Sequence, residues 1–305
     1  MFDVLALTAP IYLLIATGFL AARSRYVAAD DVRAVGRVVM RLCMPAAIFV
    51  AVSGADVTEV LRWNFVLGYT GGSLVVFGAG LIVARRVLGQ SQQGAALLAM
   101  GMSCSNSAFM GFPVAAMAVG DAALQAFTMA MLIENILMMP LAVTLAEARP
   151  GQGLRALGQT ALGMVRNPLL IAVMAGVAFS LSGLAMPGFV AATLAMLAPV
   201  APPLALLAVG GIVATLPPAR GVGVVPWVVA GKLVAHPLAV LGGLTLAGPM
   251  PAPLLLSGVL IAAVPMMSIY ALFGQRWGQE QVAASSLLTA TVLSFVTVSA
   301  AIALI

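Results

Sequence analysis

Polar residues and a proline interrupt a long apolar stretch in the first half of the chain. The run Ser103-Cys104-Ser105-Asn106-Ser107 lies inside this stretch, and Pro113 follows within two helical turns. Small polar side chains can simply let helices pack closely, but the amide of Asn106 needs hydrogen-bond partners. Proline breaks or kinks a helix, and freed amides at the start of a half-helix suit a carboxylate. We therefore expect Ser103, Ser105, Asn106 and Pro113 to line a substrate site.

A second proline stands at the corresponding place in a later apolar stretch. Pro265 lies near its middle and is followed by Ser268 and Tyr270. A single proline could be a simple kink, which is common in membrane helices. Paired interruptions in the two halves of a chain, however, are typical of a transport site. We expect Pro265 to meet Pro113 at a crossover, with Ser268 and Tyr270 as nearby hydrogen-bond donors.

Two opposite charges lie deep within other apolar stretches. Glu134 is about 13 residues into its stretch, roughly 20 Å at 1.5 Å per residue, and Lys232 is about 10 residues into another. A charge at that depth is costly and usually faces a partner or a cavity. We expect Glu134 and Lys232 to pair or to share a polar network. His236, one turn from Lys232, and Asn135, beside Glu134, are placed in the same coupling or support group.

Three interpretations of this charged group remain open. The network could titrate and couple proton movement to transport, because charges inside membranes are usually functional. It could instead be a fixed pair that replaces a bound cation. A static pair that only fixes packing is the third interpretation.

The composition of the chain indicates that these apolar stretches are surrounded by lipid. The chain is 63% apolar and 8% charged, whereas soluble domains are about a quarter charged. Disorder requires low hydrophobicity and is also excluded. The net charge of +5 comes from basic residues in short gaps between apolar runs, which indicates membrane topology rather than a nucleic-acid surface. We therefore predict an all-α integral membrane protein in contact with the lipid bilayer and with no nucleic-acid partner.

Ten apolar runs are long enough for transmembrane helices, which need about 20 residues each. Asp3 precedes the first run, and because a secretory signal would open with basic residues, we interpret this run as a retained helix. The predicted runs lie near 4–22, 35–53, 64–84, 94–119, 122–146, 160–182, 189–215, 222–247, 252–274 and 282–304.

The distribution of arginines predicts the orientation of these helices. The even gaps between runs contain Arg62 with Asp56, Glu59 and Asp121. Lys and Arg are in excess on the cytoplasmic side, so both termini are expected outside a cytoplasmic (inner) membrane. The odd gaps and adjacent helix ends contain Arg23, Arg25, Arg33, Arg37, Arg41, Arg85, Arg86, Arg149, Arg155, Arg166, Arg220 and Arg276.

Ten helices divide into two halves of five, near 1–150 and 151–305. An odd number of helices per half gives the second half the opposite orientation, which is the inverted-repeat plan of many secondary transporters. The interruptions in runs four and nine correspond in the two halves. Runs two and seven also correspond, with Arg41–Pro45 against Pro199–Pro203.

Signatures of enzymes, metals and cofactors are absent from the sequence. There is no G-x-S-x-G, H-E-x-x-H or Walker motif, and His236 is the single histidine. Cys43 and Cys104 are isolated within apolar runs, so we expect neither a disulfide framework nor a metal site. A cation/proton antiporter usually needs paired intramembrane carboxylates, whereas Glu134 is the one deep carboxylate. That antiporter and a non-transporting membrane sensor remain the alternatives to an organic-anion carrier.

Several short motifs together resemble the auxin efflux carrier family, over nearly the full length of the chain. The segment Asn106–Pro113 is similar to that family's Asn-x-x-Phe-x-Gly-x-Pro crossover. The other motifs are similar to its signatures in helices six, seven and eight, and they are Arg166–Ile171, Pro202–Leu206 with Gly210, and Lys232–Pro237.

This resemblance implies a ten-helix, five-plus-five inverted repeat with crossed broken helices four and nine, a fold also found in bile-acid symporters. Helices one, two, six and seven would form a scaffold, and the other six a moving transport domain of an elevator-type carrier, often a homodimer. The substrate carboxylate would bind near Asn106, Pro113 and Pro265. Family substrates are small organic anions such as malonate or, in plants, auxin, and a proton is the expected coupling ion ahead of sodium.

One segment is closer to malonate carriers of this family. Pro265–Tyr270 followed by Gly274-Gln275-Arg276 resembles those carriers. Met266 and Met267 stand where many relatives have alanine and polar residues, which changes the size and polarity expected of the pocket. The sequence therefore predicts a bacterial secondary transporter for a small carboxylate, with proton coupling as one option.

Overall fold

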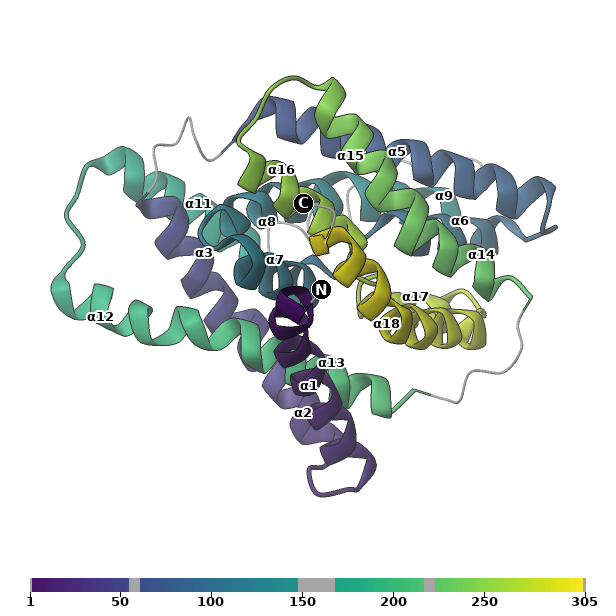
Figure 1. The fold of residues 1–305 in the computed structure, drawn as a ribbon, viewed down its shortest axis with the longest axis horizontal. Helices are drawn as coiled ribbons and strands as arrows, with labels where there is room; N and C mark the ends of the chain where they lie inside the picture. Colours follow the sequence, from purple (N-terminus) through teal and green to yellow (C-terminus); the bar gives the residue numbers. More distant parts are fainter. Residues whose placement is uncertain (1, 55–60, 148–167, 217–222, 304–305) are drawn as a thin grey trace.

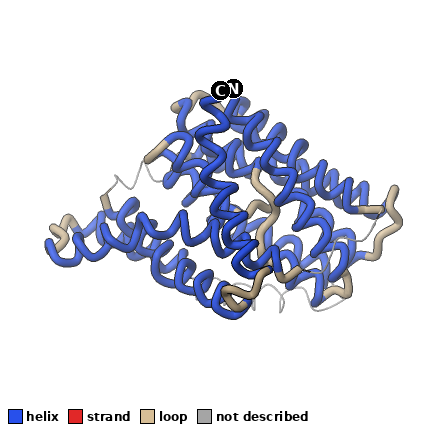
Figure 2. Tube along the Cα trace, turned by 60° about the horizontal axis from the view of Figure 1, so that its bottom comes forward, coloured by secondary structure: helices blue, strands red, loops and turns tan. Residues whose placement is uncertain are grey.

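The computed structural model describes residues 2–54, 61–147, 168–216 and 223–303, and this part of the chain is helical with no β-strand. Figure 2 shows loops mainly at the connections between helices. The helices, labelled as in Figure 1, are α1 (Phe2–Arg23), α2 (Ala29–Val38), α3 (Met44–Ser53), α5 (Trp63–Arg86), α6 (Gln92–Ser103), α7 (Phe112–Val119), α8 (Ala122–Ile133), α9 (Met139–Glu147), α11 (Pro168–Ser182), α12 (Gly188–Leu197), α13 (Ala201–Ala214), α14 (Val225–Ala230), α15 (His236–Leu246), α16 (Ala252–Ala263), α17 (Tyr270–Arg276) and α18 (Glu280–Ala303).

The described helices overlap the predicted apolar runs, although several of them, α2 most of all, begin or end outside these runs. Five helical stretches are long and apolar enough to cross a membrane, and four shorter ones are also apolar. Some predicted residues lie outside the described ranges, namely Arg149, Arg155, Arg166, Asn167, Arg220, Asp56 and Glu59. The longer stretches are Trp63–Arg86, Ala122–Glu147, Gly188–Ala214, Val225–Leu246 and Glu280–Ala303.

Four helices in the described part of the chain contain a wide π-helical turn, and each turn has the same cause. A proline is the second residue of the helix that follows each turn. Proline has no N–H for the carbonyl four residues earlier, and its ring clashes with that carbonyl, so the backbone widens there. In each case that carbonyl belongs to the central residue of the turn. The turns Val39–Cys43, Ser107–Gly111, Glu134–Met138 and Gly231–Ala235 precede Pro45, Pro113, Pro140 and Pro237.

The helices pack in two groups. The first helix group consists of α1, α2, α3, α11, α12 and α13, and the second of α5 to α9 with α14 to α18 (Figure 1). Glycines permit the closest contacts within each group. A Cβ at Gly210 of α13 would lie 1.9 Å from the carbonyl oxygen of Ile15 in α1, and one at Gly243 of α15 would lie 2.2 Å from that of Gly68 in α5. Backbone-to-backbone packing of this kind fixes helices to each other within a group.

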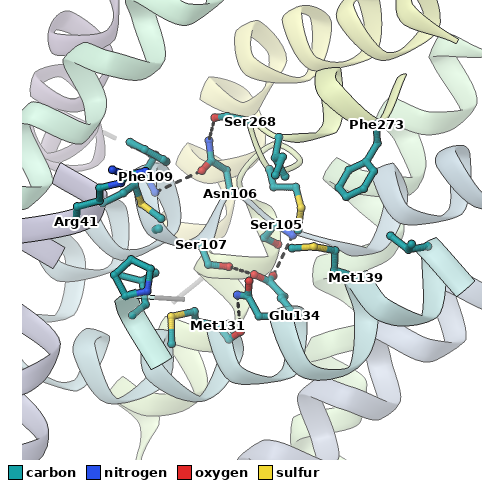
Figure 3. Close-up of a pocket in the computed structure, with 18 of the residues that line it drawn as sticks. Arg41, Ser105, Asn106, Ser107, Phe109, Met131, Glu134, Met139, Ser268 and Phe273 are labelled. Atoms are coloured by element: carbon teal, nitrogen blue, oxygen red, sulfur yellow. Dashed lines mark hydrogen bonds between the residues drawn. The ribbon is translucent and has the colours of Figure 1, made fainter. Parts of the chain in front are cut away.

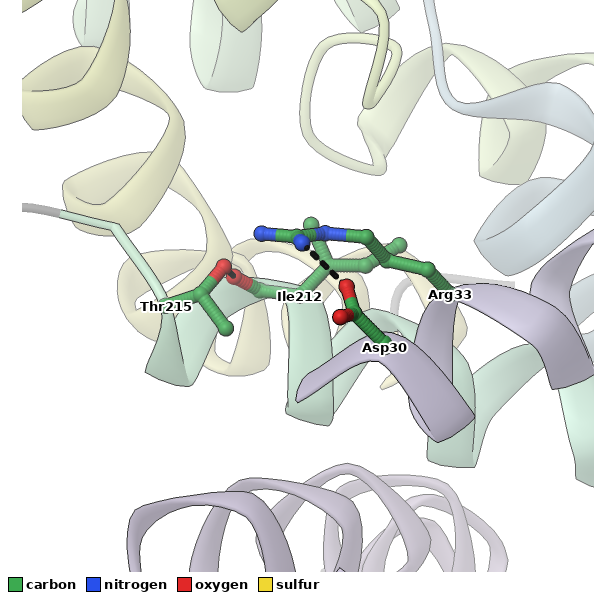
Figure 4. Close-up of polar contacts among 4 residues, drawn as sticks. All are labelled: Asp30, Arg33, Ile212 and Thr215. Atoms are coloured by element: carbon green, nitrogen blue, oxygen red, sulfur yellow. Dashed lines mark hydrogen bonds and ion pairs between the residues drawn. The ribbon is translucent and has the colours of Figure 1, made fainter. Parts of the chain in front are cut away.

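Exposed polar contacts lie where α2 meets the end of α13 in the first helix group. Arg33 of α2 forms an exposed ion pair with Asp30 at 2.8 Å, next to the end of α13, where the Thr215 hydroxyl donates to the carbonyl of Ile212 (Figure 4). Exposed pairs of this type contribute at most about 1 kcal/mol. The start of α1 and the end of α18 lie close together in both views of the molecule (Figures 1 and 2).

Candidate functional site

The two expected helix breaks meet at the centre of the second helix group. The chain leaves α6 at Cys104, where φ is −111° and ψ is 130°, and leaves α16 at Val264, where φ is −75° and ψ is 163°. The two extended stretches pair antiparallel at Ser105 and Met266. The amide of Asn106 donates to the carbonyl of Pro265 at 2.8 Å. This pairing satisfies backbone groups that the breaks free inside the protein.

The Asn106 side chain connects the two breaks. Its Nδ2 donates to the hydroxyl of Ser268 at 3.1 Å, and its Oδ1 accepts from the amide of Phe109 at 3.3 Å. Asn106 therefore caps the half-helix that begins at Ser107. The first amides of a helix lack partners within it, so those of Ser107 and Ala108 are available for an anion beside this cap.

Glu134 is held by three hydrogen-bond donors. Its Oε1 accepts from the amide of Ser105 at 2.9 Å and from the hydroxyl of Tyr69 at 3.2 Å, and its Oε2 accepts from the hydroxyl of Ser107. The side chain is 2% exposed. Two of these donors belong to the α6 break, so the charge of Glu134 fixes the backbone at the crossover.

Lys232 lies on the opposite side of Ser105. Its Nζ donates to the Ser105 hydroxyl at 2.9 Å, to the Ala262 carbonyl at 2.6 Å and to Nδ1 of His236 at 2.9 Å. Because Nδ1 accepts from an ammonium, we assign the proton of a neutral His236 to Nε2, which lies 3.0 Å from the Ser73 hydroxyl. His236 thereby extends the network to α5.

The expected pairing of the two deep charges takes the form of a shared network. Ser105 joins them, since its amide donates to Glu134 and its hydroxyl accepts from Lys232. Within the described ranges, ion pairs closer than 4 Å occur elsewhere, at Arg33–Asp30 and Arg276–Glu147, and not between these two residues. The charges of Glu134 and Lys232 thus stabilise the same short stretch of unwound backbone from two sides.

A cavity of about 660 Å³ opens beside the crossover, between the two helix groups (Figure 3). The first group contributes Met40, Arg41, Pro168 and Leu169 to its wall. The cavity extends from the crossover to the ion pair between Arg276 and Glu147, which measures 2.7 Å. The second group contributes Ser105, Asn106, Ser107, Ala108, Phe109, Met131, Glu134, Asn135, Met139, Val143, Glu147, Met267, Ser268, Ile269, Phe273 and Arg276.

Five of the predicted site residues line this cavity, and six do not. Those that line it are Ser105, Asn106, Glu134, Asn135 and Ser268. Those placed behind its wall are Ser103, Pro113, Pro265, Tyr270, Lys232 and His236, all of them buried.

The buried residues have other contacts. The Ser103 hydroxyl donates to the carbonyl of Ala99 within its own helix. Tyr270 packs on α6, where a Cβ at Gly101 would lie 2.7 Å from its hydroxyl oxygen. Pro265 contributes its carbonyl to the crossover, and Pro113 shapes the turn before α7. These residues therefore support the crossover from behind, and Ser103 and Tyr270 present no donor to the cavity.

Several residues of the cavity and network have no site role predicted from the sequence. Tyr69 and Ser73 complete the network from α5, and their signal was polar residues four apart on one face of an apolar helix. The arginine distribution explains Arg41 as a topology residue, but Arg41 also lies in a π-helical turn before a proline and lines the cavity. Glu147 and Arg276 form the ion pair at the cavity wall.

Comparisons with known proteins identify the family of this chain. The family model described as "Membrane transport protein" matches residues 3–302. A protein of Rhizobium meliloti (strain 1021) with the printed name "Putative malonate transporter" is 29% identical over 315 residues, which cover 100% of this chain and 97% of that protein. Because the family match covers almost the whole chain, the protein belongs to this membrane transport family, the auxin efflux carrier family that its motifs resemble, and is a transporter rather than an enzyme.

Proposed function

We propose that this protein is a secondary carrier that moves a small carboxylate across the cytoplasmic membrane through the cavity at the crossed breaks. The observation that carries the proposal is the position of Asn106. Its side chain bridges both breaks through Ser268 and caps a half-helix, and it lies on the wall of the 660 Å³ cavity. Broken helices that meet at mid-membrane form the sites of many secondary transporters.

The chemistry of the cavity wall favours an anion of small size. The half-helix that starts at Ser107 presents free amides and the positive end of its dipole at the crossover. Met131, Met139 and Phe273 make much of the remaining wall apolar. The relative from Rhizobium meliloti is named for malonate transport, which supports malonate or a similar short carboxylate as substrate.

Movement between the two helix groups would carry the substrate. We propose ten spans in two inverted halves, 1–150 and 151–305, with the first helix group as scaffold and the second as an elevator-type transport domain. Close glycine packing within each group, and a cavity between the groups, support this division. No residue of α12 in the scaffold is buried, so this apolar helix offers a surface for a homodimer or for lipid.

The orientation follows from the arginine distribution. Arg41 and Arg276, which belong to the arginine-rich gaps, both line the cavity, so the cavity would open toward the cytoplasm. The start of α1 and the end of α18 lie together, which supports placing both termini on one side, the outside.

Glu134 is the candidate for proton coupling. It lines the cavity and accepts from Ser105 and Ser107, so a proton on its carboxyl group would change the crossover backbone next to the substrate. Transport by Glu134→Gln tests this. Loss of the pH dependence of uptake supports coupling, whereas an unchanged pH profile removes Glu134 as the proton site and leaves a fixed network.

Flux measurements in proteoliposomes test the proposed function itself. Purified protein should exchange external radiolabelled malonate against internal unlabelled malonate, while protein-free liposomes should not. Flux of sodium against protons without carboxylate flux would instead identify a cation antiporter. The absence of any solute flux, under gradients of either kind, would identify a sensor and overturn the proposal.

A further inference from the structure

Arg41 occupies an unusual place for an arginine of a membrane helix. It is the central residue of the π-helical turn Val39–Cys43, and its carbonyl is the one that Pro45 cannot bond. π-helical turns often occur at functional sites because they redirect side chains. The Arg41 side chain is exposed to the cavity, beside Phe109 in the view of Figure 3.

The charges around the cavity leave Arg41 without a counterion in the described part of the chain. Glu134 shares its network with Lys232, and Glu147 pairs with Arg276. No ion pair is formed by Arg41 among the described residues. The segment 148–167, which follows Glu147, contains no acidic residue in its sequence. Among the described residues of the cavity wall, Arg41 therefore carries a positive charge with no acidic partner.

Arg41 and Asn106 belong to different helix groups and line the same cavity. Asn106 and the half-helix amides form one anion-binding end on the second group, and Arg41 forms a separate one on the first. A monocarboxylate can use only one of these ends. A dicarboxylate that reaches both ends would place one carboxylate at the crossover and the other at the guanidinium, whose fork suits bidentate binding.

We propose that Arg41 binds the second carboxylate of a dicarboxylate substrate and is the residue that makes the carrier prefer dianions over monoanions. This inference rests on the proposed function, because it assumes that the cavity binds a carboxylate. Before transport, the uncompensated guanidinium faces a cavity wall rich in methionine and phenylalanine. The second carboxylate of the substrate neutralises it there, and a neutral group of equal size does not.

A simpler role for Arg41 would be to mark the cytoplasmic side of its helix. Arg37 provides the matched comparison, since it lies one helical turn earlier, is exposed, and does not line the cavity. A topology role predicts equal consequences of replacing either arginine. A substrate-binding role predicts an effect of Arg41 alone.

The test measures equilibrium binding of malonate and monomethyl malonate to purified protein. The two ligands share a skeleton and differ by one charge. The wild type should prefer malonate. Arg41→Gln should weaken malonate binding by about ten-fold or more, about 1.4 kcal/mol, and change monomethyl malonate binding by less than about two-fold. Arg41→Lys should keep part of the preference, and Arg37→Gln should behave as the wild type.

Other outcomes overturn the inference. An unchanged malonate preference in Arg41→Gln would do so, as would equal losses for both ligands or the same loss in Arg37→Gln. If Arg41→Gln does not fold, Arg41→Lys decides, because a preference identical to the wild type would show that the preference does not depend on the guanidinium fork and would overturn the inference. A wild type that binds neither ligand rejects the proposed function as well, whereas malonate binding that is insensitive to Arg41 rejects the inference alone.

Discussion

Replacing Lys232 with methionine removes one of the two charges that hold the unwound stretch at Ser105. The methionine fills similar space but leaves the Ala262 carbonyl, the Ser105 hydroxyl and His236 without their donor. It also leaves the Glu134 carboxylate buried without its compensating charge. Removing one partner of a buried pair typically costs about 3–5 kcal/mol, so we expect a loss of that size in the free energy of unfolding.

Glu134→Gln should have a cost in the same range. Tyr69, Ser105 and Ser107 all donate to the carboxylate of Glu134. A glutamine keeps one acceptor oxygen but replaces the other with an NH₂ group, so at least one of these donors loses its acceptor. The double variant contains neither charge, so its cost should be well below the sum of the two single costs. We expect a coupling energy above about 1.7 kcal/mol, the upper value for single hydrogen bonds between membrane helices.

Equilibrium unfolding in mixed detergent micelles gives the free energies of the four proteins. Ser257→Ala provides the control, since its buried hydroxyl bonds within α16 to Pro253 and lies outside the network. Its cost should add to that of Lys232→Met. If the costs of Lys232→Met and Glu134→Gln add within about 0.5 kcal/mol, the two charges act independently and the shared network is wrong.

The remaining predictions concern packing and single contacts, and unfolding in micelles measures all of them. Gly210→Ala would place a Cβ against a backbone carbonyl of α1 and should lower stability by about 2 kcal/mol or more, while Gly78→Ala, with open space around it, should be neutral or stabilising by up to about 1 kcal/mol. Equal effects would contradict the close α1–α13 contact. Tyr69→Phe removes one donor to a buried carboxylate and should cost about 1.5–3 kcal/mol, and no cost would remove Tyr69 from the network. Glu147→Gln breaks a partly exposed ion pair with Arg276 and should cost at most about 1 kcal/mol, so a larger loss would assign the pair a structural role.

The helix breaks and the deep charges could be predicted because their signals are local. A proline beside polar residues inside an apolar run indicates a break wherever the chain folds, and the breaks at Cys104 and Val264 are present. Helix ends were less accurate. The α2 helix begins at Ala29, six residues before the predicted run at 35, because its first turns are amphipathic and carry Asp30, Asp31 and Arg33 rather than apolar residues.

The direction of individual side chains near the breaks could not be predicted. Helical spacing tells which residues share a face only while the helix is continuous, and a break ends that relation. Ser103 and Tyr270 therefore point away from the cavity although neighbouring residues line it. Tyr69 was missed because the face of an apolar helix that meets the crossover depends on packing. The position of Arg41 could have been recognised from the sequence. It lies four residues before a proline, within the same kind of π-helical turn that contains Glu134 and Lys232.

The site at the crossover depends most directly on Asn106, and ligand-induced stabilisation tests it. A ligand at 100 times its Kd stabilises the native state by about 2.7 kcal/mol. Malonate should raise the thermal stability of the wild type and of Asn64→Ala, whose side chain bonds to Pro249 away from the cavity. Asn106→Ala should express and fold but show no such rise. Equal stabilisation of Asn106→Ala by malonate would contradict the assignment of the carboxylate site to the crossed breaks.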